Sequence, residues 1–173
     1  MFRTQKITMK KLVFFLLSTM LLQGAIQAQT AAPVIKDLRM LIQSAQDNFK
    51  DQLGEKVETD TVNKMIFYKT KMETAAAQTF ILHLESNEKN IYVIKYNMKT
   101  LDVNLLKMLS IIVNLYVDEL NNMVKSGNYT GRDYTDRDGM SVTEINDKAG
   151  NHILDYSSNS ETQNIYVFGL IKN

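Results

Sequence analysis

The chain has 173 residues, of which 45% are hydrophobic and 23% charged, and its formal net charge at neutral pH is +1. This length suits one domain, and the absence of cysteine excludes disulfides, a thiolate nucleophile and a sulfur-ligated zinc site. Acidic and basic residues are mixed along the chain, without the basic stripe that would indicate nucleic acid or an anionic lipid surface as a partner.

The first 28 residues have the layout of a secretory signal peptide. A basic start precedes an apolar run over residues 12–22, and small residues close the segment. The run is shorter than the roughly 20 residues that a membrane-spanning helix needs, which predicts no transmembrane anchor. With cleavage after Ala28, we expect a single domain over residues 29–173, periplasmic or secreted. The leader holds four of the 20 basic residues and none of the 19 acidic ones, which leaves the product a net charge of −3.

Hydrophobic periodicity predicts a first helix that begins near Pro33 and stops at Gly54. Proline suits the first turn of a helix and glycine its end. We expect one face of this helix to lie on a sheet, because apolar residues recur at intervals of three and four. They are Val34, Leu38, Leu41, Ile42, Ala45, Phe49 and Leu53.

A second helix is predicted over residues 101–125, with Thr100 as its N-cap and Ser126-Gly127 as its end. Apolar side chains occupy most of its circumference, which is typical of a buried helix. Its one narrow polar stripe contains Lys107, Ser110, Asn114 and Asp118. Two interpretations stay open. Enclosure within the domain is the preferred one, and an exposed face that forms a homodimer or meets another partner is the alternative.

Alternating and apolar runs bounded by polar turns predict the strands. Before the second helix they cover residues 64–72 and 79–85 and a further run from residue 90. After it they cover residues 128–135, 140–147, 151–158 and 163–172. The sequence therefore predicts an α+β fold, with two helices packed on one side of a mainly antiparallel sheet.

Two segments of the chain resemble each other. The hairpin that starts at Ile81 is similar to the one that starts at Ile153, and Asn90-Ile91-Tyr92-Val93 matches residues 164–167 without a gap. Each hairpin follows one predicted helix. This similarity suggests two related helix-plus-strands units, over residues 34–98 and 100–172.

The stretch DYTDRDGMSVTEI, residues 133–145, resembles a calcium loop at first sight. With Gly139 at the sixth position of an EF-hand loop, the first and last ligand positions fall on Tyr134 and Ile145, which are unsuitable. The residues that follow are strand formers rather than an exit helix. We therefore favour a hairpin turn in which Asp138-Gly139 are the two central residues and the glycine takes a positive φ.

No pattern in the chain marks a catalytic, cofactor-binding or metal-binding residue. His83 and His152 are the only histidines, and they lack the paired spacing of a zinc site. His83 is expected at an exposed or edge position, because it faces away from Phe80, Leu82 and Leu84. Nucleophile elbows and phosphate-binding glycine loops are missing as well.

Tyrosines recur on or beside the predicted strands. An aromatic sheet face binds sugars, peptides or apolar ligands, because the ring stacks and the hydroxyl hydrogen-bonds. The preferred interpretation is that each ring packs along the sheet with its hydroxyl in water. These residues are Tyr68, Tyr92, Tyr96, Tyr134, Tyr156 and Tyr166.

The sequence therefore favours a non-catalytic exported module that binds a protein or small ligand through its sheet or its second helix. One alternative is a calcium-dependent surface or adhesion module that uses the acids from Asp133 to Glu144. The other is a hydrolase in which acids, a serine and a histidine converge.

Overall fold

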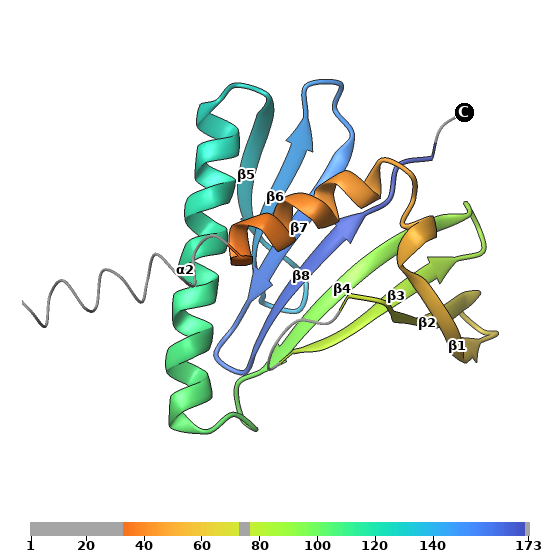
Figure 1. Cartoon of the computed structure of the whole chain (residues 1–173), viewed down its shortest axis with the longest axis horizontal. Helices are drawn as coiled ribbons and strands as arrows, with labels where there is room; N and C mark the ends of the chain where they lie inside the picture. The colour runs from red at the N-terminus through yellow and green to blue at the C-terminus, as the bar shows by residue number, and fades with distance from the viewer. Residues whose placement is uncertain (1–32, 73–76, 172–173) are drawn as a thin grey trace, which may run out of the picture.

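The computed structural model describes residues 33–72 and 77–171. The predicted signal peptide over residues 1–28 lies outside the described residues. These residues form two α-helices, a short 3₁₀ helix and one large sheet, whose twist is visible in Figure 1, and the predicted α+β class is confirmed.

The sheet has eight strands in the order β1-β2-β3-β4-β8-β7-β6-β5, and every neighbouring pair is antiparallel. In the first half they are β1 (Leu53–Asp60), β2 (Met65–Thr70), β3 (Gln78–Leu84) and β4 (Lys89–Asn97). In the second half they are β5 (Tyr129–Thr135), β6 (Ser141–Asp147), β7 (His152–Ser158) and β8 (Thr162–Phe168). Each half is one helix followed by a four-stranded meander, and β4 pairs with β8 to join the halves.

The first helix covers residues 33–45 and ends earlier than predicted. The prediction was wrong beyond Ala45 because Asn48 and Phe49 take φ values of 54° and 57°, which lie in the left-handed region and end a right-handed helix. A short 3₁₀ helix, η1 (Lys50–Gln52), then leads into β1. Strand β1 was missed at the sequence level because Val57 is the single apolar residue among the charged ones after Gly54.

The second helix, α2 (Val103–Lys125), begins two residues later than predicted. Its N-cap is Asp102 rather than Thr100, since the Asp102 carboxylate accepts hydrogen bonds from the backbone N–H groups of Asn104 and Leu105. The predicted end is confirmed, with Gly127 at φ 72°.

Helix α2 is not enclosed, so the preferred interpretation of its surroundings was wrong. One side is buried against the sheet, where Ile112 is 5% exposed. The other side is open to solvent and carries the predicted polar stripe together with Ile111 and Val117, which are 38% and 37% exposed. Among the described helices, none is long and apolar enough to cross a membrane.

The two faces of the sheet differ in what covers them. The helix face packs with both helices into the main core. Its members there are Ile81, Tyr92, Ile94, Tyr96, Ile145, Ile153, Leu154, Ile165 and Val167. The opposite face, which we call the open face, has no described helix on it, and its buried Ile91, Val93 and Val142 lie outside that core. In Figure 1 the first helix crosses in front of β7 and β8, while α2 runs along the β5 side.

The matching segments of β4 and β8 are out of phase. Tyr92 pairs with Val167 on the helix face, whereas Val93 pairs with Tyr166 on the open face. Side chains alternate along a strand, so a shift of one residue moves every side chain to the other face. The two halves therefore share a topology, but the repeated Asn-Ile-Tyr-Val segment presents opposite residues to the core in each half.

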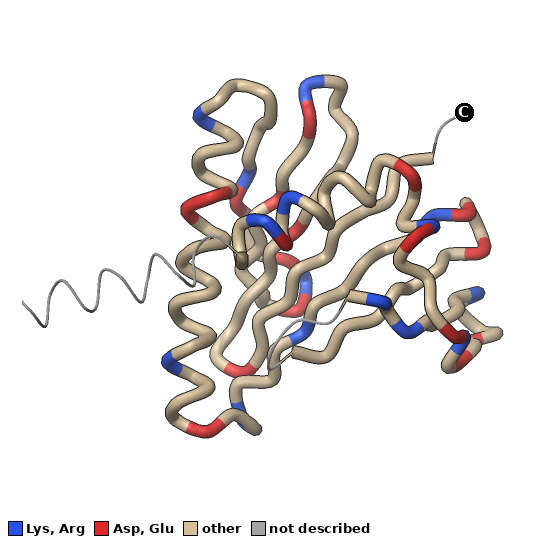
Figure 2. Tube along the Cα trace, viewed as in Figure 1, with Lys and Arg blue, Asp and Glu red and all other residues tan. Residues whose placement is uncertain are grey.

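Charged residues are interspersed along the chain, and strand β8 carries none (Figure 2). A buried polar side chain on β8 therefore has no charged residue of its own strand beside it.

Candidate functional site

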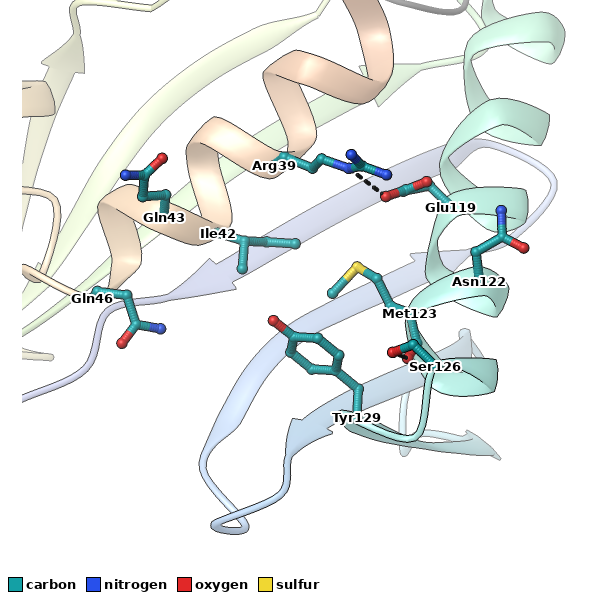
Figure 3. Close-up of a pocket in the computed structure, with 9 residues that line it drawn as sticks. All are labelled: Arg39, Ile42, Gln43, Gln46, Glu119, Asn122, Met123, Ser126 and Tyr129. Carbon is teal, nitrogen blue, oxygen red and sulfur yellow. Dashed lines mark hydrogen bonds and ion pairs between the residues drawn. The ribbon is translucent and has the colours of Figure 1, made fainter.

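The structure has two hollows that merit comparison, one on each side of the sheet. The first, which we call the helix cleft, has a volume of about 470 Å³ and lies between the first helix, α2 and the start of β5 (Figure 3). Its lining consists of Arg39, Ile42, Gln43, Gln46, Glu119, Asn122, Met123, Ser126 and Tyr129.

An ion pair crosses the helix cleft. Arg39 Nε donates to Glu119 Oε1 at 2.7 Å, and this hydrogen bond raises the pKa of Arg39. The Glu119 side chain is only 6% exposed, whereas that of Arg39 is 67% exposed. A buried carboxylate without a partner costs several kcal/mol, so the pair is explained by the stability of the fold. The charged groups of this cleft satisfy each other.

The second hollow, which we call the open-face hollow, lies on the other side of the sheet and has a volume of about 500 Å³. It extends over β8 and its neighbours, and the loop between β5 and β6 contributes to its lining. The lining residues are Lys95, Tyr134, Asp136, Asp138, Met140, Val142, Asp155, Ser157, Thr162, Asn164, Tyr166 and Phe168.

Asn164 gives the open-face hollow an unusual lining group. Its side chain is on β8, the uncharged central strand, and the residue is only 7% exposed. Its Oδ1 atom has no hydrogen-bond partner within the described part of the chain. Buried polar atoms are nearly always hydrogen-bonded, and leaving one unpaired costs about 1–3 kcal/mol. The fold does not supply the partner that this oxygen needs.

Three aromatic rings also line the open-face hollow. Phe168 stacks on the His152 ring with centroids 4.0 Å apart, and Lys89 Nζ lies 5.1 Å from the centroid of the Phe168 ring. Tyr166 is half-buried, and burial raises the pKa of its hydroxyl. The ring of Tyr134 is more exposed, with the guanidinium carbon of Arg132 lying 5.1 Å from its centroid. The hollow therefore offers both flat apolar surfaces and a buried acceptor.

The charges that line the open-face hollow are mainly negative. Asp136, Asp138 and Asp155 contribute carboxylates, and Lys95 contributes the single amine. Asp155 Oδ1 accepts a hydrogen bond of 2.7 Å from His152 Nε2. The lining thus favours ligands that donate hydrogen bonds over ligands that accept them.

The loop that resembled a calcium site is a hairpin turn. Gly139 takes a φ of 77°, as predicted, but the loop has three residues rather than two, because Asp136 N donates to Met140 O. The Asp136 carboxylate accepts from the backbone N–H groups of Asp138 and Met140, at 2.9 and 2.8 Å.

The acids from Asp133 to Glu144 do not converge on one point. Asp133 pairs with Thr143, whose hydroxyl donates to it at 2.6 Å, while Glu144 receives a hydrogen bond from Arg132 at 2.7 Å. Thr143 and Glu144 are adjacent on β6, so the two acids point to opposite faces of the sheet. Asp133 and Glu144 therefore do not face the same ion.

A group of possible metal ligands lies beside the open-face hollow and was missed at the sequence level. Ligand atoms of Glu144, His152 and Asp155 are all within 4.8 Å of one another. The register explains this, because Glu144 pairs with Asp155 across β6 and β7. Both Glu144 oxygens already accept hydrogen bonds, from Arg132 Nη2 and Asn146 Nδ2 at 2.7 Å each. A metal ion here has to displace Arg132.

The histidines contact acids and amides rather than hydroxyl groups. His83 faces away from Leu82 as predicted, but it is half-buried in the interior strand β3 rather than exposed at an edge, and its Nδ1 donates to Asn90 Oδ1 at 2.8 Å. Within residues 33–72 and 77–171, neither His83 nor His152 is hydrogen-bonded to a serine or threonine. In the described residues, neither histidine therefore has the serine partner that the hydrolase alternative predicts.

The predicted strand tyrosines divide between the two faces. Tyr92 and Tyr96 belong to the helix-face core and are almost fully buried, so the expectation of hydroxyls in water was wrong for them. Tyr134 and Tyr166 line the open-face hollow. Their shared face follows from the register, because Tyr134 pairs with Val142 and Tyr166 pairs with Asp155.

None of the protein-family models, curated proteins or solved structures compared with this chain matches it.

Proposed function

We propose that this protein is a non-catalytic exported binding module that holds a small polar ligand in the open-face hollow. The observation that carries the proposal is the unpaired Oδ1 of Asn164, a buried acceptor in an open hollow with aromatic lining. Ligand sites are concave, largely apolar and furnished with a few well-placed polar groups. A ligand donor placed on this oxygen removes the cost of leaving it unpaired.

The helix cleft is a weaker candidate for the same role. It has a similar volume, but its ion pair is internal to the protein and links the two helices. A ligand that separates this pair leaves the buried Glu119 carboxylate unpaired, which destabilises the fold. In the open-face hollow, Asn164 Oδ1 has no partner among the described residues that a ligand would have to displace.

A small ligand also fits the surface better than a homodimer through α2. Over residues 107–118, the central part of α2, the exposed side has four polar residues and two partly exposed apolar ones, Ile111 and Val117. Stable homodimer interfaces bury large and mainly apolar surfaces. We therefore expect the protein to bind its ligand as a monomer.

The proposal is tested by NMR titration of ¹⁵N-labelled residues 29–173 with mixtures of small amines, carboxylic acids, sugars and nucleosides. At least one mixture is expected to shift the amide signals of β5, β6, β7 and β8 residues around the hollow. The Asn164→Leu variant is expected to lose these shifts.

Gln163→Met is the matched control for Asn164→Leu. Gln163 is the neighbouring residue and also has a buried unpaired oxygen, but it pairs with Tyr96 on the helix face. Its substitution should leave ligand binding unchanged. Binding that survives in Asn164→Leu, shifts confined to the helix cleft, or no shifts with any mixture would each overturn the proposal.

A further inference from the structure

We infer that the ligand of the open-face hollow is a small organic cation, whose ammonium or guanidinium group donates to Asn164 Oδ1. This inference rests on the proposed function and adds the chemical class of the ligand. The lining includes Asn164, whose buried Oδ1 is unpaired among the described residues, together with an excess of carboxylates and aromatic rings on one face of the sheet.

The unpaired atom of Asn164 requires a donor. A carbonyl oxygen accepts hydrogen bonds and never donates them, so a ligand carboxylate or phosphate cannot satisfy it. An ammonium group offers three N–H donors and a guanidinium group five. Hydrogen bonds from such charged donors are also stronger than those from neutral ones.

The charges around the hollow favour a cation. Three aspartates and one lysine line it, which leaves an excess of two negative charges. Two of the aspartates, Asp136 and Asp138, come from the β5–β6 loop, and Asp155 comes from β7. These carboxylates attract a cation before contact and repel an anion.

The two loop carboxylates, Asp136 and Asp138, are not arranged around a metal ion. A calcium ion needs several oxygens at 2.3–2.6 Å, and neither Asp136 nor Asp138 belongs to a convergent group of ligands within the described residues. Asp136 Oδ1 is moreover held by two backbone N–H groups. The volume of about 500 Å³ lies within the range of sites for small organic ligands.

The aromatic rings suit the same class of ligand. The face of an aromatic ring attracts cations, most strongly where water is excluded. The open face already shows this preference at two rings, where Lys89 lies over Phe168 and Arg132 lies over Tyr134. Tyr166 lies on β8 and pairs with Asp155 of β7. Among the described contacts, no cation lies over its ring.

The ligand class is tested by calorimetric titration of residues 29–173 with three probes. Cadaverine represents a free amine, and lysine blocked at both its amino and carboxyl ends represents a basic side chain of a peptide. The third probe is the same blocked lysine acetylated on its ε-nitrogen, which keeps the shape and removes the charge. We expect at least one charged probe to bind at least tenfold more tightly than the acetylated one, with an affinity that falls as salt is raised.

Variants identify where the charged probe binds. Asn164→Leu is expected to weaken its binding roughly tenfold, as the loss of one charge-assisted hydrogen bond predicts, and Gln163→Met is expected to leave it unchanged. Asp138→Asn, in an exposed loop, should weaken it roughly threefold by removing one nearby charge. This variant keeps the test valid if Asn164→Leu does not fold. Binding of cadaverine but not of blocked lysine identifies a free amine, and the reverse identifies a side chain.

Each contrary result has a separate meaning. The inference of a cationic ligand is overturned if the acetylated probe binds as tightly as the charged ones, or if only a neutral sugar binds. If that binding still depends on Asn164, the hollow remains the ligand site. Binding of the charged probes that is insensitive to both Asn164→Leu and Asp138→Asn overturns the site itself. If neither charged probe binds, the inference that the ligand is a cation is overturned.

Discussion

Asn90 and Asn164 begin the same four-residue segment, on the two strands that join the halves of the sheet, yet their amides have opposite surroundings. Asn90 is 4% exposed, accepts a hydrogen bond from His83 Nδ1 and donates from Nδ2 to the backbone oxygen of Asn48 at 2.7 Å. Asn164 is 7% exposed, and its Oδ1 has no partner within the described residues. One amide cross-links the fold, and the other faces a hollow.

The difference shows that burial alone does not define the role of a polar residue. Asn48 takes a positive φ just after the first helix, and its Oδ1 also accepts from the backbone N–H of Asn90. Asn90 therefore fixes the turn that reverses the chain into η1 and β1. Asn164 Oδ1 has no comparable partner among the described residues, and its residue lines the open-face hollow.

The largest effect is expected from Asn90→Ala. This change leaves the Asn48 carbonyl and His83 Nδ1 without their Asn90 partners, and each lost partner of a buried group costs about 1–3 kcal/mol. We expect the free energy of unfolding to fall by about 3 kcal/mol, measured by urea denaturation. A loss as small as the one expected below for Asn164→Leu would remove the contrast between the two residues.

A second large effect is expected from Gly169→Ala, which tests the same turn from the other side. A Cβ atom at this position would overlap Asn48 Oδ1 and lie 2.9 Å from the backbone oxygen of Asn90. We expect a loss of about 2 kcal/mol from this overpacking, again by urea denaturation. Gly131→Ala is the matched control, because its Cβ would meet only side chains at 3.3 Å or more and one backbone oxygen at 4.0 Å. Equal losses for the two variants would argue against a tight turn at Asn48.

A near-neutral effect on stability is expected from Asn164→Leu. Replacing an unpaired buried amide with an apolar side chain of similar size removes an unsatisfied group, so the unfolding free energy should change by less than about 1 kcal/mol. The same urea experiment measures it. A loss as large as that of Asn90→Ala would show that Asn164 has a structural partner and would weaken its assignment to the hollow.

The smallest effect concerns Glu144, on the open face near Asp155. Hydrogen bonds from Asn146 and Arg132 lower the pKa of Glu144 below its usual 4.5. A carboxyl group with a lowered pKa in the folded state adds stability above pH 4.5 and loses it as the pH falls below that value. Asn146→Ala should therefore reduce the stability at neutral pH slightly and flatten its decline in acid, measured by thermal melts across this range. An unchanged pH profile would contradict the role of Asn146.

Much of the fold follows from local sequence patterns. The period of α2, its Gly127 end and the Asp138-Gly139 turn are properties of short segments, and these were predicted correctly or within two residues. The end of the first helix was missed, because Phe49 continues the apolar period while its φ of 57° comes from the contact of Asn48 with β4. Strand β1 was missed because its stability comes from pairing with β2 rather than from an apolar face.

The candidate site depends on register, which no short segment contains. Asn164 stands in a segment that the sequence comparison singled out, but the assignment of Asn90 and Asn164 to opposite faces follows from the pairing of β4 with β8. The approach of Glu144 to Asp155 likewise follows from the β6–β7 pairing. A prediction of the complete hairpin registers would have placed Tyr134, Asp155 and Tyr166 on one face.

The position of β8 between β4 and β7 has a consequence for how the chain folds. It is the last strand in chain order, and it pairs with β4 across a long loop that contains α2 and three other strands. Closing such a loop is slow compared with forming a local hairpin. Until β8 arrives, β4 is an unpaired edge with apolar residues on both faces, Ile91 and Val93 on one and Tyr92 and Ile94 on the other. Such an edge pairs readily with other chains, so aggregation of this protein is expected to start from molecules in which β8 has not yet docked.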